Sequence, residues 1–298
     1  MSRAAPVLIP IAYILIGIFL LDVMAVIIRM LSDEYPTLQL AALRNLFGLI
    51  PSLLVLATSA DWHSNGRLLR MRQWPIGMLR GVLVTGAQVC FYFALLELEF
   101  ATVGTLVYAS PLIVTALSVP ILGERVGAWR WSAVLIGFIG IIMIMGPGSD
   151  TFTLAALLPL GAALGYASSS VLIRRIDRDV PAPVVNLYAT AAAMICATLL
   201  MLGSGEVEMI KSWPDAGLIA LMGCSGGLGV LFLIFAYRRA APAVLAPFEY
   251  SGILIVFCLG WLFFDEAPVD TLFPGVFFVV GAGLLIIWRE QKVARSRS

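Results

Sequence analysis

Long apolar runs, interrupted by short breaks of polar residues, glycine and proline, fill most of the sequence. A helix needs about 20 mainly apolar residues to cross the hydrocarbon core of a bilayer, and most of the runs reach that length. The runs are continuous rather than alternating, which favours helices over the strands of a membrane β-barrel. The pattern predicts an all-α integral membrane protein with ten transmembrane helices, at about 7–31, 38–59, 75–96, 101–122, 129–146, 152–173, 182–203, 214–237, 242–264 and 271–288.

Composition agrees with a membrane protein. The chain is 61% hydrophobic and 12% charged, whereas soluble domains carry about 25% charged residues. A net charge of +1 without a basic stripe excludes nucleic acid as a partner. The four cysteines lie inside apolar runs without disulfide or zinc spacing, so we interpret them as packing residues and expect no metal or cofactor.

Charged residues in the predicted loops divide by sign. Arginines gather in one set of loops, whereas the opposite set carries acidic residues and a single lysine, Lys211. Because arginine and lysine favour the cytoplasmic side of a membrane, both termini are predicted to lie in the cytoplasm, with the protein in a bacterial-type inner membrane. The loop arginines are Arg67, Arg70, Arg72, Arg125, Arg130, Arg174, Arg175, Arg178, Arg238 and Arg239.

An internal repeat becomes visible when the chain is shifted by 142 residues. In that register Tyr108 meets Tyr250, and Glu124 meets Glu266. Each copy holds five predicted spans, residues 1–146 and 147–298, and an odd number of spans inverts the second copy. Inverted five-helix halves are typical of secondary transporters, whose substrate site lies near mid-membrane between the halves. The charged hinge at Glu124 and its counterpart at Glu266 are then boundaries between spans, and Glu124 is interpreted as a turn residue rather than a catalytic acid.

Two segments carry a resemblance to a known family: SPLIVTALSVPILGERVGAWRWSAVLIGFIGIIMI and ILIVFCLGWLFFDEAPVDTLFPGVFFVVGAGLLII. In each, a fourth span ends in Gly-Glu or Asp-Glu before a glycine-rich fifth span. The sequence resembles the EamA branch of the drug/metabolite transporter superfamily over nearly its whole length. The resemblance implies transport of small metabolites, many of them outward, with general similarity to aromatic and neutral amino-acid exporters of the YddG kind. The second copy departs from the pattern at Asp265 and Pro268.

Five charged residues fall inside predicted spans: Asp22, Arg29, Arg44, Arg80 and Glu249. A charge at mid-bilayer costs about 2.5–3.5 kcal/mol on insertion scales, so each is a candidate functional residue. By depth along their helices, Asp22 can pair with Arg44 and Glu249 with Arg80, while Arg29 reaches the headgroups. Besides such ion pairs, a carboxyl group can bind a cation or a coupling proton, and an arginine can bind a substrate carboxylate.

Aromatic and weakly polar side chains at mid-depth are candidates to line a substrate cavity, because a tyrosine ring offers apolar contact together with a hydroxyl group. Packing between helices is an equal alternative for these tyrosines. Together with Glu249, the candidate substrate-binding residues are Gln88, Tyr92, Tyr108, Tyr166, Ser169, Tyr188 and Tyr250.

Glycines cluster within several spans. The GCSGGLG stretch at 223–229 lacks the lysine and the serine or threonine that end a phosphate-binding loop, so nucleotide hydrolysis is excluded. Gly77 with Gly81, and Gly161 with Gly165, have the small-xxx-small spacing that predicts close approach of helices.

These patterns predict a secondary transporter rather than an enzyme. We expect a monomer whose partners are the lipid bilayer and a small-molecule substrate, and which exports small metabolites, amino acids above all, by alternating access. The alternative within the class is an uptake carrier for a vitamin or a nucleoside-like metabolite such as S-adenosylmethionine. Outside the class, an intramembrane enzyme would need a catalytic set at one depth, and a sensor would need a soluble output domain; neither is visible in the sequence.

Overall fold

The computed structural model describes residues 5–58, 62–63, 69–123, 128–145, 154–177, 179–239, 245, 248–267 and 269–295. Over these residues the regular structure is helical, with no strand. The helices are α1 (Ala5–Leu31), α2 (Thr37–Thr58), α4 (Trp74–Glu97), α5 (Phe100–Val107), α6 (Ser110–Leu122), α7 (Ala128–Met145), η1 (Leu154–Ala156), α8 (Leu157–Ile173), α9 (Ala182–Ser204), α10 (Trp213–Arg239), α12 (Ser251–Phe264), α13 (Val269–Leu272) and α14 (Gly275–Arg295).

Among the residues that the structure describes, seven segments are long and apolar enough to cross a membrane. They are α1, α2, α4, α5 together with α6, η1 together with α8, α9 and α10. Two further apolar helices are shorter, namely the Trp131–Met145 part of α7 and α12. The described helices follow the predicted apolar runs. The predicted all-helical architecture with several membrane-spanning helices is therefore confirmed for the described residues.

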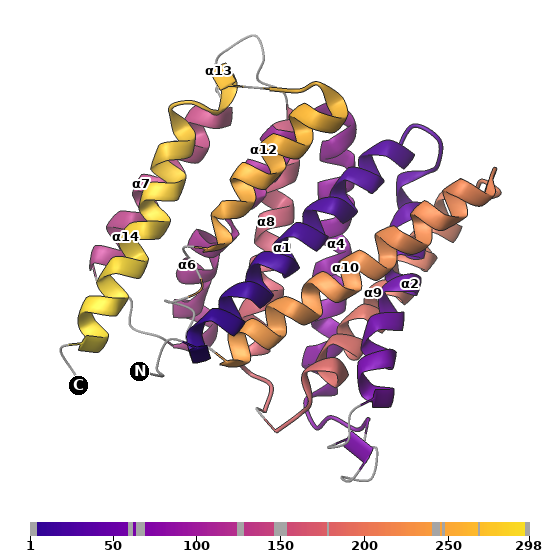
Figure 1. Ribbon diagram of the computed structural model, residues 1–298, viewed down its shortest axis with the longest axis horizontal. Coiled ribbons are helices and arrows are strands. Elements are labelled where there is room, and N and C mark those ends of the chain that lie inside the picture. The colour runs from indigo at the N-terminus through magenta and orange to yellow at the C-terminus, as the bar shows by residue number, and fades with distance from the viewer. Residues whose placement is uncertain are drawn as a thin grey trace.

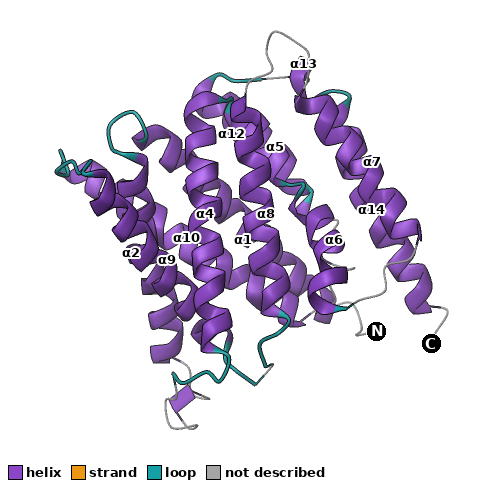
Figure 2. Ribbon diagram, turned by 180° about the vertical axis from the view of Figure 1, so that it is seen from behind, coloured by secondary structure: helices purple, strands orange, loops and turns teal. Residues whose placement is uncertain are grey.

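The helices stand side by side in one bundle (Figure 1). α7 packs on α14 at one edge and α2 packs on α9 at the opposite edge, as the views from both sides show (Figures 1 and 2). Between these edges α1 packs against α10 and α12, whereas α4 packs against α8 and α9. α5 contacts α12, and α6 contacts α8. Helices from the two halves of the sequence therefore alternate through the bundle.

Glycines bring helix backbones into contact at several crossings, two of which involve α4. A methyl group at Gly81 of α4 would overlap the Ala189 carbonyl of α9, and one at Gly165 of α8 would lie 2.9 Å from the Leu83 carbonyl of α4. Only a residue without a side chain permits such an approach. The close helix contacts predicted from the small-xxx-small spacing are confirmed at both glycines.

The loops divide by charge between the two ends of the bundle. The connections α1–α2, α4–α5, α9–α10 and α12–α13 meet at one end, which we call the acidic end. Connections α2–α4 and α8–α9 meet at the other, the basic end, where the Gln73 amide donates to the Asp177 carboxylate at 2.6 Å. α1 begins and α14 ends at the basic end (Figure 1). The hinge residues Glu124 and Arg125 lie outside the described residues. The acidic-end loops and adjoining helix ends hold Asp33, Glu34, Glu97, Glu99, Glu206, Glu208, Lys211, Asp265 and Glu266.

Candidate substrate site

The fourth predicted span is broken near its middle. Tyr108 and Ala109 form a tight turn between α5 and α6, in which the Ala109 N–H donates to the Leu106 carbonyl at 3.1 Å. Pro111 lacks an N–H and cannot continue the hydrogen-bond ladder of α5. The chain therefore restarts as a second helix, α6, at the middle of the bundle.

A matching break precedes α12. Tyr250 forms the turn, and its carbonyl accepts a hydrogen bond from the Ile253 N–H at 3.2 Å. The Ser251 hydroxyl donates to the Phe248 carbonyl at 2.6 Å. Tyr250 lies 142 residues after Tyr108, which is the offset of the sequence repeat. Both broken spans thus place a tyrosine at the turn.

The far ends of α6 and α12 match as well. Gly123 follows α6 and Asp265 follows α12, and both adopt the left-handed conformation, with φ of 69° and 55°. Glycine reaches this region freely, and aspartate reaches it more readily than most residues. The departure of the second copy from Gly-Glu to Asp-Glu therefore preserves the backbone geometry of the helix end.

The Tyr108 side chain links the first break to α1 and α12. Its hydroxyl lies 3.4 Å from both carboxylate oxygens of Asp22, which is buried in α1. A methyl group at Gly252, the second residue of α12, would overlap the same hydroxyl. The carboxylate of Asp22, the hydroxyl of Tyr108 and the beginning of α12 therefore meet at one point in the core.

Arg44 on α2 does not meet Asp22. Its Nε lies 3.3 Å from the sulfur of Met24, and its Nη1 donates to the Asn45 side-chain oxygen at 2.9 Å. Met24 follows Asp22 by two residues, so their side chains leave α1 about 200° apart. A guanidinium that contacts Met24 is therefore turned away from the Asp22 carboxylate, and the predicted ion pair between Asp22 and Arg44 is wrong.

Asn45 and Gln88 join α2 to α4 beside Arg44. The Asn45 side-chain amide donates to the Gln88 oxygen at 2.8 Å and to the Ala41 carbonyl at 2.9 Å, and the Gln88 amide donates back to Asn45 at 3.2 Å. Both side chains are buried. Sequence reasoning singled out Gln88 but missed Asn45, although a second polar residue next to Arg44 in an apolar run was a visible signal.

Two of the predicted tyrosines belong to the core cluster that contains Met24, the residue that Arg44 contacts. Tyr92, one turn beyond Gln88 on α4, is 1% exposed, and its hydroxyl has no hydrogen-bond partner among the described residues. Tyr166 of α8 is half-buried and packs against the same core cluster. Tyr92 shares a face of α4 with Gln88, whose partner Asn45 accepts a hydrogen bond from Arg44. The structure therefore links Gln88 to Arg44 through Asn45 and places Tyr92 one turn from Gln88.

The other predicted residues lie apart from this group. Arg80 faces α8, where its Nε donates to the Ser169 carbonyl at 2.9 Å, so the predicted ion pair between Arg80 and Glu249 is wrong. Glu249 is half-buried beside the Tyr250 break, and the Tyr250 hydroxyl has no partner among the described side chains and backbone. Tyr188 of α9 packs in an apolar cluster near the basic end.

Glu266 closes the acidic end between the two broken spans. One of its oxygens accepts a hydrogen bond from the N–H of Phe100, the first residue of α5, at 2.6 Å, and the other lies 3.5 Å from Arg29 of α1. The rings of Phe100 and Phe264 pack with centroids 5.4 Å apart. Burial and the nearby charge of Glu266 raise the pKa of Glu99 above its ordinary value of 4.5. A residue expected only to mark a span boundary therefore joins α1, α5 and α12.

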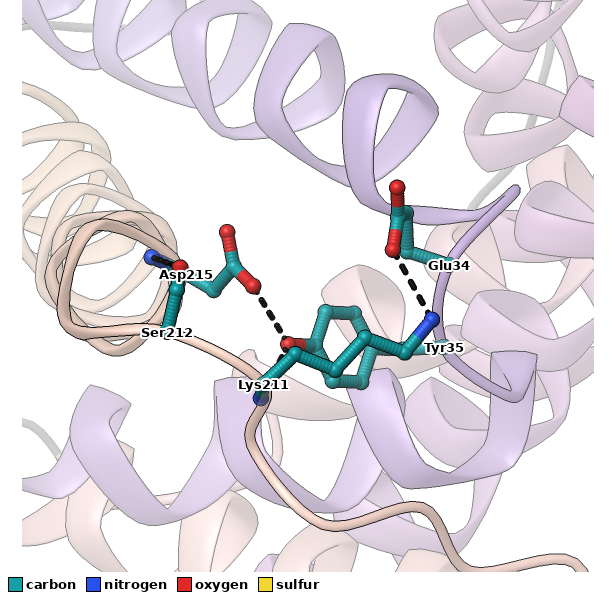
Figure 3. Close-up of polar contacts among 5 residues, drawn as sticks. All are labelled: Glu34, Tyr35, Lys211, Ser212 and Asp215. Carbon is teal, nitrogen blue, oxygen red and sulfur yellow. Dashed lines mark hydrogen bonds and ion pairs between the residues drawn. The ribbon is translucent and has the colours of Figure 1, made fainter.

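A second link at the acidic end is centred on Tyr35 (Figure 3). The buried Tyr35 hydroxyl donates to the Asp215 carboxylate at 2.6 Å and accepts from the Lys211 N–H at 2.9 Å. The Lys211 ammonium group forms an ion pair with Glu34 at 2.8 Å. The α1–α2 loop is thereby tied to the α9–α10 loop.

A bundle of long apolar helices, with two spans broken in the core around buried charged and phenolic groups, defines a multi-pass membrane protein of the solute-transporter class. Residues 8–146 match the model of the EamA-like transporter family. A riboflavin transporter of Vibrio cholerae is 30% identical over 248 residues, which cover 77% of this chain and 77% of that protein. The chain belongs to the EamA-like transporter family.

Further relatives differ in what they carry. The pseudopaline exporter CntI of Pseudomonas aeruginosa is 27% identical over 88% of this chain and 90% of its own length. An S-adenosylmethionine uptake transporter of Rickettsia felis is 23% identical over 93% of both chains. A crystal structure that is 20% identical superposes with a TM-score of 0.65 over 98% of this chain and 99% of that one, which shows the fold alone. The relatives are named transporters rather than enzymes, whereas their substrates differ.

Proposed function

We propose that this protein is a secondary transporter that exports small zwitterionic metabolites, amino acids in particular, by alternating access. The observation that carries the proposal is the pair of broken spans at Tyr108 and Tyr250, which surround the buried carboxylate of Asp22. Discontinuous helices near mid-membrane form the substrate and ion sites of many secondary transporters. The proposed protein acts as a monomer, with the bilayer and a small molecule as its partners and without a cofactor.

Ten spans in two inverted halves, residues 1–146 and 147–298, belong to this proposal, and the helix contacts support them. α5 and α6 count as the fourth span, and the segment that ends in α12 counts as the ninth. In two five-span halves, each span corresponds to the span five places further along the chain. Under this exchange the α1–α10 contact becomes α8–α4, α10–α2 becomes α4–α9, and α1–α12 becomes α8–α6, and all of these contacts occur. The α2–α9, α7–α14 and α5–α12 contacts map onto themselves. Two halves related by a two-fold axis in the membrane plane would show this pattern.

The two ends of the bundle differ in how tightly the fourth span is packed. α5 is buried from Phe100 to Leu106, whereas α6 buries only Leu112, Ile113 and Ser118. In the proposed mechanism the acidic end is closed in this conformation, and α5 and α12 separate when it opens. The basic end faces the cytoplasm of an inner membrane, together with both termini, because arginine and lysine favour that side.

Asp22 is the proposed coupling residue. Its carboxyl group is buried, has the Tyr108 hydroxyl as its only hydrogen-bond partner among the described residues, and forms no ion pair with a described cation. A proton or a substrate ammonium group bound there would neutralise a charge that is costly within a bilayer. Because the same point joins α1, the first break and α12, a change in the charge of Asp22 acts on helices that must move.

Uptake of a vitamin or a nucleoside-like metabolite is the second candidate function. Relatives named as riboflavin transporters and as S-adenosylmethionine uptake transporters favour it. The acidic residues Asp22 and Glu249 near the breaks would suit a cationic substrate such as S-adenosylmethionine, whereas they give no advantage to uncharged riboflavin.

Flux through reconstituted protein separates these proposals. Liposomes containing the full chain are loaded with unlabelled compound, and counterflow of labelled amino acids, S-adenosylmethionine and riboflavin is measured with and without a pH gradient. We expect counterflow of amino acids, accelerated by a proton gradient in the wild type and insensitive to it in Asp22→Asn. Asp33→Asn, an exposed change at the acidic end, serves as the control. No flux above that of empty liposomes for the whole panel would contradict the transport proposal.

A further inference from the structure

Arg44 is a buried guanidinium without a carboxylate partner among the described residues. It is 6% exposed, and the ion pairs of the described chain, Arg29–Glu266 and Lys211–Glu34, both lie at the acidic end. Its described acceptors are the Met24 thioether, which accepts only weakly, and the side-chain oxygen of its neighbour on α2. Its Nη2 group has no hydrogen bond within the described chain. A buried cation normally requires an anion or a full set of acceptors.

The surroundings hold this guanidinium in one position. Asn45, which accepts from Nη1, is itself fixed by two-way hydrogen bonds to Gln88 of α4. On the side of α10, a methyl group at Gly226 would lie 2.9 Å from both Nε and Nη2 of Arg44. A glycine of the GCSGGLG stretch is therefore needed to admit the side chain. A guanidinium held in this way is the planar fork through which arginine binds a carboxylate with two parallel hydrogen bonds.

A buried phenolic hydroxyl lies in the same part of the bundle. The Tyr92 hydroxyl is buried and has no hydrogen-bond partner within the described chain. Tyr92 lies one turn beyond Gln88 on α4, and Gln88 bonds to the Asn45 that accepts from Arg44. Tyr166, from α8, packs against the core cluster that holds Tyr92 and Met24. A phenolic hydroxyl can donate to an anionic oxygen. Within the described chain, a cation without an ion pair and a buried donor without an acceptor thus lie in one region, and together they are complementary to an anion.

We infer that Arg44, assisted by the Tyr92 hydroxyl, binds the carboxylate of the transported substrate. The inference rests on the proposed transport function and narrows it to substrates with a free monocarboxylate. One guanidinium balances one negative charge, whereas the second charge of a phosphate dianion would remain uncompensated in the core. Arg44 and Met24 come from the first half of the sequence, and Gly226 and Tyr166 come from the second. The site therefore contains residues of both halves, so movement of one half relative to the other changes the environment of Arg44.

The test compares amino acids with their amides, which keep the ammonium group and lose only the anionic oxygen. Counterflow is measured in liposomes for L-phenylalanine, L-tryptophan and L-methionine and for the three corresponding amides. The wild type is expected to move at least one acid more than about tenfold faster than its amide, because a site built for a polar group discriminates strongly against its loss. Arg44→Gln should reduce this ratio to within about twofold, and Arg44→Lys should leave an intermediate ratio because it keeps charge but not the fork.

Further variants make the result specific. Tyr92→Phe removes only the hydroxyl and is expected to lower the acid-to-amide ratio by a few-fold, about the effect of one hydrogen bond. Arg70→Gln removes an exposed arginine at the basic end and should keep the wild-type ratio. The ratio is the readout because loss of folded protein lowers both fluxes together.

The outcomes separate this inference from the transport proposal. A wild type that moves an acid and its amide equally fast overturns the inference and leaves transport intact, as does an Arg44→Gln variant that keeps the wild-type ratio. If Arg44→Gln loses all flux, the Arg44→Lys variant decides. Faster transport of the acid than of its amide by Arg44→Lys supports the inference, and equal rates overturn it. A wild type that moves no member of the panel overturns transport itself, and the inference with it.

Discussion

Replacing Glu266 should open the acidic end of the bundle. The hydrogen bond from the Phe100 N–H to Glu266 is short, at 2.6 Å, and involves a charged acceptor; such bonds contribute about 1.5–3 kcal/mol. The contact with Arg29 is longer, at 3.5 Å, and the two side chains are 24% and 18% exposed, so it adds less than about 1 kcal/mol. Glu266→Ala removes both contacts, which amounts to about 2 kcal/mol, or roughly a 30-fold increase in the population in which α5 and α12 are apart.

Cysteine reactivity measures this population. Ala101 is buried on α5 and faces α12 near Gly260, so a cysteine there reacts with a membrane-impermeant thiol reagent only when the acidic end opens. In a background without the four native cysteines, Glu266→Ala should accelerate labelling about 30-fold, and Glu266→Gln, which keeps an acceptor oxygen, should accelerate it less. Glu208→Ala is the matched control, because Glu208 bonds through its backbone. A labelling rate unchanged by Glu266→Ala would refute the assignment of Glu266 as a closing contact.

Three further changes test the packing and electrostatics of the fold. Gly81→Ala should destabilise the protein by about 1–3 kcal/mol, because the added methyl group overlaps the backbone of α9. Gly86→Ala on the same helix has open space around it and should stabilise the protein by up to about 1 kcal/mol. Thermal unfolding in detergent distinguishes the two variants, and equal effects would contradict the close crossing of α4 and α9. The raised pKa of Glu99 stabilises the fold at low pH, and this contribution is lost as pH rises from 4.5 through the pKa of the folded state. Glu99→Gln should therefore flatten the pH dependence of the melting temperature and should raise the melting temperature at neutral pH. An unchanged pH profile would argue against repulsion between Glu99 and Glu266. Tyr35→Phe removes a hydroxyl that donates to the Asp215 carboxylate and accepts from the Lys211 N–H, so it should lower the free energy of unfolding by about 1–2 kcal/mol. An unaltered melting temperature would show that this link does not stabilise the fold.

The positions of Arg44 and Asp22 suggest how substrate binding is linked to the proposed proton binding. Arg44 contacts Met24, and Asp22 contacts Tyr108, so the cation and the carboxylate occupy different faces of α1. In the proposed mechanism the substrate carboxylate binds Arg44 and the coupling proton binds Asp22, so the two ligands occupy opposite sides of that helix. Movement of α1 relative to its neighbours would then change both environments together, which is a physical route for coupling.

The sequence by itself determined the helical architecture and predicted a repeat within it. The length of an apolar run is a local property, so the spans could be located without knowledge of their neighbours. The acidic and basic ends follow from loop composition in the same way, and the glycine spacing predicted the crossings at Gly81 and Gly165. The repeat offset also aligned Tyr108 with Tyr250, and both proved to lie at helix breaks.

Only the tertiary structure decided which buried groups meet. Depth along a helix can be read from the sequence, and it correctly put Asp22 and Arg44 inside the bundle. The direction in which each side chain points depends on the rotation of its helix, which is set by packing against segments far away in the chain. For that reason the predicted ion pairs were wrong, Asn45 was missed, and Glu266 was understood as a boundary rather than as the contact that joins α1, α5 and α12.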